Sequence, residues 1–143
     1  NEIVLTLDQL GIEAFHHDAG NIFSSYRIDL DGNARSITMI NGGEFYVACE
    51  EGGAYRLNMG FSSQWSSEIQ FAEDLYVTHV ANNKYQLALS CSGNGLVLYE
   101  AGSDFSIYEK GIHDIGYVYH AEFSKGYLFA ATREGLQIFE IVE

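Results

Sequence analysis

Residues 135–139 read GLQIF, a glycine followed by a stretch in which apolar residues alternate with others. The same arrangement occurs three times earlier, as GIEAF at 11–15, GAYRL at 53–57 and GLVLY at 95–99. The four glycines are separated by 42, 42 and 40 residues. Self-similarity at a nearly fixed period indicates a repeated structural unit, so the whole chain has to be interpreted as repeats.

Gly53, Gly95 and Gly135 are each preceded by two further apolar stretches, joined by the turn sequences NGG, NNK and SKG, and Gly11 is preceded by one. A fourth alternating stretch follows each GLQIF-type segment except the last, as at 21–29, 67–73 and 105–111. One unit is therefore four short antiparallel strands, named a to d, in about 42 residues. Tyr127 lies eight residues before Gly135 but Tyr85 lies ten before Gly95, which predicts a two-residue insertion in SCSGN.

The glycines fit the tight reversal between strands b and c. The segments EEGG, SGNG and REG place glycine where a hairpin needs a positive φ angle, which other residues resist. None of these segments leads into a helix, so a phosphate-cradling role is not indicated.

Strand order across the chain predicts an all-β fold of β-propeller blades, each with four antiparallel strands. The order is b-c-d, a-b-c-d, a-b-c-d, a-b-c, which makes fourteen strands. We place the blade units at about 1–32, 33–74, 75–114 and 115–143. The first unit lacks strand a and the last lacks strand d, so we expect about half of a larger ring. Exposed strand edges would then favour a homo-oligomer or completion by further blades.

Residues 119–141, YHAEFSKGYLFAATREGLQIFEI, resemble one repeat of the WD-repeat and LVIVD-repeat propellers. GLQIFEI is close to the LVIVD strand, and Ala48, Ala88 and Ala130 fit the small-residue positions at the end of the apolar strand that precedes it in the repeat. The Trp-Asp and Gly-His pairs of WD repeats are absent. This resemblance implies a binding scaffold for proteins or peptides.

Composition excludes several classes of function. Seven basic against 20 acidic residues give a net charge of −13, which leaves no basic footprint for nucleic acid or an anionic membrane surface. No apolar run approaches the ~20 residues of a membrane-spanning helix. Cys49 and Cys91 are too few for a disulfide framework. We expect two buried free thiols, which favours a reducing compartment such as the cytoplasm.

The histidines offer no evident metal or catalytic site. His16, His17 and Asp18 fall on a predicted polar connection without metal-ligand spacing. His79 and His120 fall on two predicted a strands, which are innermost in a blade. The repeat alignment sets His79 against Ala121 and His120 against Thr78. The two side chains should therefore point to opposite sides of their strands and form no shared site.

Candidate partner-binding residues are aromatic and histidine side chains near connections. Trp65 precedes a predicted outer strand and is of a residue type that often anchors interfaces. Tyr117 precedes an inner strand and should share a face with Tyr119. His113 precedes Asp114, which would suit an orienting pair, although no nucleophile elbow accompanies them. The candidates are thus Trp65, His79, His113, Tyr117 and His120.

The sequence therefore predicts a non-catalytic scaffold that binds a protein or peptide partner. It predicts no catalytic residue, no metal ligand set and no cofactor. Two alternatives stay open. One is a propeller enzyme of the hydrolase or lyase type whose site is completed by further blades. The other is a purely structural half propeller. Histidine or acidic clusters on inner strands, with shifted pKa values, would favour the enzyme.

Overall fold

The protein is described by a computed structural model that covers residues 2–41, 43–59 and 65–142. Within these residues the chain forms fourteen strands in four antiparallel sheets. The described part contains no helix long and apolar enough to cross a membrane. The all-β fold class is confirmed.

The first two sheets follow the order of the chain. The first has three strands, β1 (Glu2–Thr6), β2 (Ile12–Asp18) and β3 (Asn21–Ile28). The second has four strands, β4 (Ser36–Asn41), β5 (Glu44–Ala48), β6 (Ala54–Met59) and β7 (Trp65–Phe71).

The last two sheets repeat this order. The third has four strands, β8 (His79–Asn83), β9 (Gln86–Ser90), β10 (Leu96–Ala101) and β11 (Ile107–His113). The fourth has three strands, β12 (Val118–Ser124), β13 (Tyr127–Thr132) and β14 (Gly135–Glu140). The predicted strand order is therefore correct.

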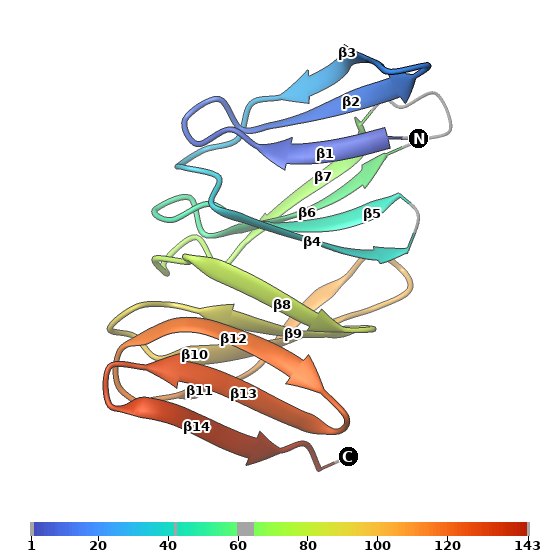
Figure 1. Cartoon of the computed structure of the whole chain (residues 1–143). Coiled ribbons are helices and arrows are strands. Elements are labelled where there is room, and N and C mark those ends of the chain that lie inside the picture. The colour runs from blue at the N-terminus through green and yellow to red at the C-terminus, as the bar shows by residue number, and fades with distance from the viewer. Residues whose placement is uncertain (1, 42, 60–64, 143) are drawn as a thin grey trace.

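The sheets stack face to face from the N-terminus to the C-terminus, as Figure 1 shows. Strands β4, β8 and β12 open their sheets, and β8 contacts both of the others. All three run in the same direction in Figure 1, so their first residues lie on the same side of the molecule. Adjacent first strands of this kind are the inner strands of β-propeller blades.

Packing between sheets decides which faces are buried. Strands β5 and β9 are buried on both faces, because each middle sheet has a sheet on either side. Among the residues that the structure describes, no sheet lies beyond β14, and this strand alternates between exposed and half-buried residues. The largest core cluster accordingly joins the second and third sheets, around Tyr46, Leu87 and Val97.

The turns between strands b and c also join neighbouring blades. Gly11, Gly53 and Gly95 have φ angles of 77°, 73° and 83°, as the sequence predicts. Within the same turns, Glu50 forms an isolated bridge with Val77 of the next blade. Corresponding bridges join residues 8 and 34, and residues 92 and 118. Each turn therefore holds the start of the next blade by backbone hydrogen bonds.

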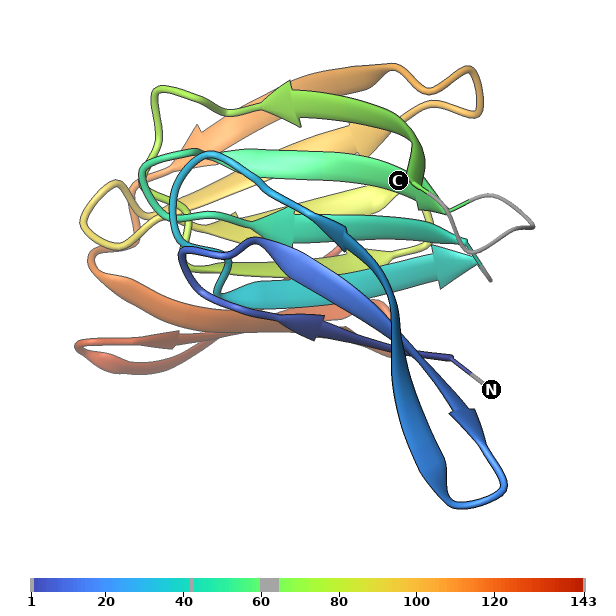
Figure 2. The same cartoon turned by 90° about the horizontal axis from the view of Figure 1, so that it is seen from above.

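The β2–β3 hairpin extends away from the other sheets, as the view from above in Figure 2 shows. His16, His17 and Asp18 are the last residues of β2 and are exposed. The prediction of a polar connection was wrong at these residues, since they pair with Phe23, Ile22 and Asn21 of β3.

Candidate functional site

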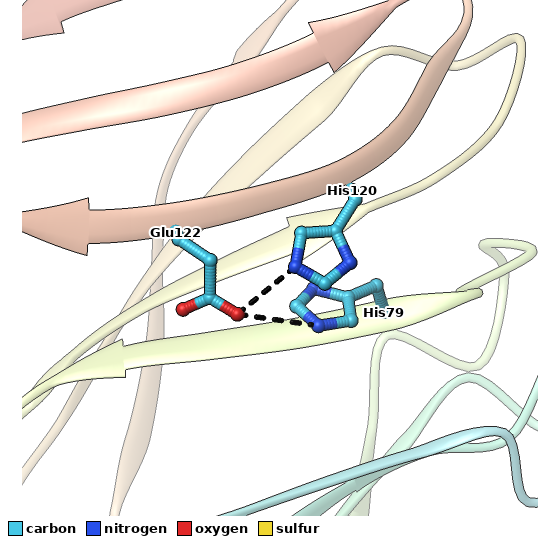
Figure 3. A group of neighbouring side chains, drawn as sticks. All are labelled: His79, His120 and Glu122. Atoms are coloured by element: carbon cyan, nitrogen blue, oxygen red, sulfur yellow. Dashed lines mark hydrogen bonds and ion pairs between the residues drawn. The ribbon is translucent and has the colours of Figure 1, made fainter.

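Two histidines and one glutamate from two inner strands meet at one point, shown in Figure 3. His79 begins β8, and His120 and Glu122 lie on β12. The imidazole centroids are 3.5 Å apart, with the rings tilted by 33°. One carboxylate oxygen, Glu122 Oε1, lies 3.0 Å from His120 Nε2 and 3.6 Å from His79 Nε2.

This meeting contradicts the prediction that His79 and His120 point to opposite sides. His79 lies opposite Ser90 in the β8–β9 ladder, and His120 lies opposite Ala131 in the β12–β13 ladder. Ser90 pairs in turn with Leu96, and Ala131 with Leu136. Leu96 and Leu136 each follow the glycine of their repeat. The two histidines therefore occupy equivalent positions of adjacent blades.

The error arose from the length of one turn. Residues 7–11, 49–53 and 91–95 form b–c turns of equal length, and each turn's first amide donates to the glycine carbonyl. In the fourth blade Thr132 pairs with Gly135, which leaves a turn one residue shorter. SCSGN thus carries no insertion, and Tyr85 lies in the a–b turn. A one-residue slip moves every side chain to the other face of its strand.

Glu122 belongs to the site but is absent from the candidates derived from sequence. Its position two residues after His120 was an available signal, because residues i and i+2 share a face of a strand. The Glu122 side chain is 59% exposed and the His120 side chain 52% exposed, so solvent reaches both.

His79 is the buried member, with 15% of its side chain exposed. Burial, and then the neighbouring His120, lower its pKa from 6.5 to about 4. The His79 ring is therefore neutral near pH 7. Within the described residues, its Nδ1 atom and the Ser90 hydroxyl are buried without a hydrogen-bond partner. The site thus offers a neutral imidazole and an exposed carboxylate, which can bind a cation or move a proton.

Aromatic residues surround the same end of β12. The rings of Tyr117 and Tyr119 are 5.0 Å apart, so they share a face as predicted. The guanidinium carbon of Arg133 lies 4.8 Å from the centroid of the Tyr117 ring. Tyr119 is 54% exposed. Together these side chains form a partly exposed aromatic and cationic patch at the start of β12.

The remaining candidates lie elsewhere. His113 ends β11 and lines an apolar cavity of about 410 Å³ between the third and fourth sheets, together with Leu98 and Phe139. The Asp114 carboxylate accepts from the Gly116 amide, so the structure shows no orienting His-Asp pair. Trp65 begins β7, and its side chain lies outside the described part of the chain.

Both cysteines are free and buried, as predicted. Cys49 and Cys91 begin equivalent b–c turns, and each amide donates to the glycine carbonyl four residues later. Burial raises the pKa of both thiols to about 12. They are structural side chains in a closed environment and not nucleophiles.

Comparison with known proteins supports the fold. No protein-family model matches the sequence, and no curated protein matches it. Among solved structures, the chain is similar to selenomethionine-substituted virginiamycin B lyase from Staphylococcus aureus, with a TM-score of 0.59 and 13% identity. The match covers 94% of this chain and 50% of that one, so this chain spans about half the length of the solved structure. That lyase is a β-propeller, and at this identity the likeness shows the fold alone.

Proposed function

We propose that the chain is a binding scaffold that works as part of a larger β-propeller. The observation that carries this proposal is the exposed outer face of β14. Leu136 is 65% exposed and Ile138 is 56% exposed. Leu96, which occupies the position of Leu136 in the preceding blade, is only 2% exposed because β12–β14 cover it.

Another β-sheet packed on β14 would bury this exposed face. Leu136 and Ile138 stand where complete blades bury side chains against the next blade, so a further blade fits this surface. Among the described strands β14 pairs with β13 alone, which leaves its other edge with unpaired backbone groups in that part of the chain. A second copy of the chain would supply four more sheets. The resulting eight sheets fall within the usual range of propeller rings.

The aromatic patch supports a protein or peptide partner for the scaffold. Tyr117, Tyr119 and Arg133 are of the residue types that dominate interface energetics. Tyr117 and Tyr119 lie at the start of β12, and Arg133 follows β13 and donates its amide to the Tyr117 carbonyl. The net charge of −13 would favour a partner with a basic surface.

The first test is the solution mass of the chain by light scattering after size exclusion. We expect a discrete dimer, twice the chain mass of 15.9 kDa. Ile138→Lys should weaken it, since a charge would be buried in the new interface. Ile112→Lys is the matched control, because Ile112 is equally exposed at 57% but lies on the outer strand of a complete sheet. A cooperatively folded wild-type monomer would contradict completion by a second copy.

A second candidate function is a propeller enzyme of the lyase or hydrolase type. The observation that favours it is the His79, His120 and Glu122 group on inner strands, where His79 has a strongly lowered pKa. The name of the similar structure supplies a probe substrate, virginiamycin B. We would follow its loss by liquid chromatography with wild type and His120→Ala. Turnover that depends on His120 would support this function, and equal rates in the two proteins would contradict it.

A further inference from the structure

We propose that His79, His120 and Glu122 form a binding site for a divalent transition-metal ion of the zinc type. The proposal goes beyond the scaffold function and does not rest on it, because all three ligands belong to one chain. Their ligand atoms lie within 4.8 Å of one another.

The distances suit one shared ion. Zinc takes nitrogen and oxygen ligands at about 2.0–2.1 Å, so two ligands of a tetrahedral site lie about 3.3–3.4 Å apart. Glu122 Oε1 lies 3.0 Å from one Nε2 atom and 3.6 Å from the other, which brackets that value. Side-chain rotations would bring the two histidine nitrogens, which lie within 4.8 Å of each other, and the carboxylate onto one ion. The exposed side chains of His120 and Glu122 have the freedom to make them.

The donor set selects the class of metal. Imidazole nitrogens suit zinc, copper and nickel, whereas magnesium and calcium prefer sites built from oxygen. Two histidines and one carboxylate are also a known set for zinc sites that keep a fourth position for water or substrate. The exposed side of the group, at His120 and Glu122, leaves an entry path for the ion.

Hydrogen bonds from the two histidines to Glu122, without a metal ion, would explain less of the structure. One carboxylate oxygen faces two Nε2 atoms, yet His79 Nδ1 has no partner within the described residues. A metal on Nε2 would place the ring proton on Nδ1, where it needs an acceptor. The Ser90 hydroxyl is also without a partner in that part of the chain, and Ser90 lies directly opposite His79 in the ladder. Such outer partners orient ligating histidines in metal sites.

Only two of the three inner strands carry the histidine. The equivalent position of β4 is Ser36, which lies opposite Ala48 and accepts from the Val80 amide. The pair on β8 and β12 is thus a local feature of two blades and not a consequence of the repeat.

The test is metal binding by the whole chain after removal of metal with a chelator. Zn²⁺ is titrated by calorimetry, and Co²⁺ serves as a spectroscopic probe of the ligand geometry. We expect one saturable equivalent per chain. His120→Ala and Glu122→Gln should each weaken binding by about tenfold or more, and Ser90→Ala by about tenfold. Side-chain ¹⁵N signals of His79 and His120 should shift on adding Zn²⁺.

A double variant, His16→Ala with His17→Ala, is the matched control, since it removes two exposed histidines from another sheet. We expect its affinity for Zn²⁺ to equal that of wild type. The proposal is overturned if wild type binds no stoichiometric ion, or if binding is lost only in the control. It is also overturned if His120→Ala and Glu122→Gln bind as wild type does. His120 and Glu122 lie two strands from Leu136 and Ile138 in the same sheet, and the mass measurement involves no metal, so such a failure leaves its result unaffected.

Discussion

Arg56 is a buried cation that joins two blades. It is 1% exposed, pairs with Glu44, and donates from Nη1 to the carbonyls of Gly102 and Ser106 in the third sheet's outer turn. The Phe105 ring lies 4.3 Å from its guanidinium carbon. The alternating stretch GAYRL gave no sign of this role, because the carbonyls that accept from Arg56 lie about fifty residues later.

Replacing Arg56 should destabilise the fold strongly. Arg56→Ala leaves the Glu44 carboxylate without its cationic partner and removes one of the donors to each of two carbonyls, so we expect a loss of about 3–5 kcal/mol in the free energy of unfolding. Arg27→Ala is the control, because Arg27 pairs with Asp29 on the surface and should cost about 1 kcal/mol or less. Urea unfolding measures both. Equal losses would show that the buried cation is not a joint between blades.

The thiols of Cys49 and Cys91 should resist alkylation in the folded protein. Burial first, then the nearby Asp31 for Cys49 and Asp74 for Cys91, raise their pKa to about 12. Almost no thiolate exists at pH 8, and neither sulfur is accessible. We expect two rapidly labelled thiols in denaturant and none in buffer, as counted by mass spectrometry. Fast labelling of the native chain would contradict this burial.

At the scale of the element, the b–c turn sets the spacing of the blades. Gly95 has a φ angle of 83°, and a Cβ atom there would lie 2.3 Å from the His113 carbonyl oxygen. Gly93 lies in the same turn, and a Cβ atom at that position would meet nothing within 4 Å. Substitutions at these two glycines therefore distinguish a specific requirement for glycine at position 95 from a general effect of changing the turn.

We expect Gly95→Ala to cost at least about 1–2 kcal/mol, because it combines a left-handed backbone with a clash. Gly93→Ala should change stability by less than about 1 kcal/mol in either direction. Thermal unfolding followed by circular dichroism compares the two variants. If both variants melted alike, the strain at Gly95 would have no energetic consequence.

At the scale of the whole molecule, burial of two thiols and one tyrosine hydroxyl predicts that the folded protein loses stability at high pH. Burial raises the pKa of Cys49 and Cys91 from 9.0 to about 12, and that of Tyr55 from 10.0 to about 12. Above pH 9 the unfolded chain loses these protons while the folded chain keeps them. Stability from these groups is therefore complete below pH 9 and is lost as the pH rises toward 12.

The measurement is the urea midpoint between pH 7 and pH 11. We expect a decline that begins near pH 9, and a smaller decline in a Cys49→Ala, Cys91→Ala variant. A midpoint that stays constant to pH 11 would contradict the pKa shifts.

The amino-acid sequence by itself determined the strands, their order and the need for glycine in the turns. These depend on neighbours in the chain: apolar alternation, turn residues and a period of about 42 residues. It also placed Tyr117 and Tyr119 on one face, because two residues of spacing are enough to decide it.

Only the tertiary structure decided that His79 and His120 meet. Their positions depend on how each inner strand pairs with its neighbour. The turn before Gly135 is one residue shorter than its equivalents, and the repeat alignment was displaced by one residue as a result. Because side chains alternate along a strand, an error of one residue reverses the predicted face. Contact between blades also set the burial of His79 and the exposure of Leu136, since both depend on whether another sheet lies alongside.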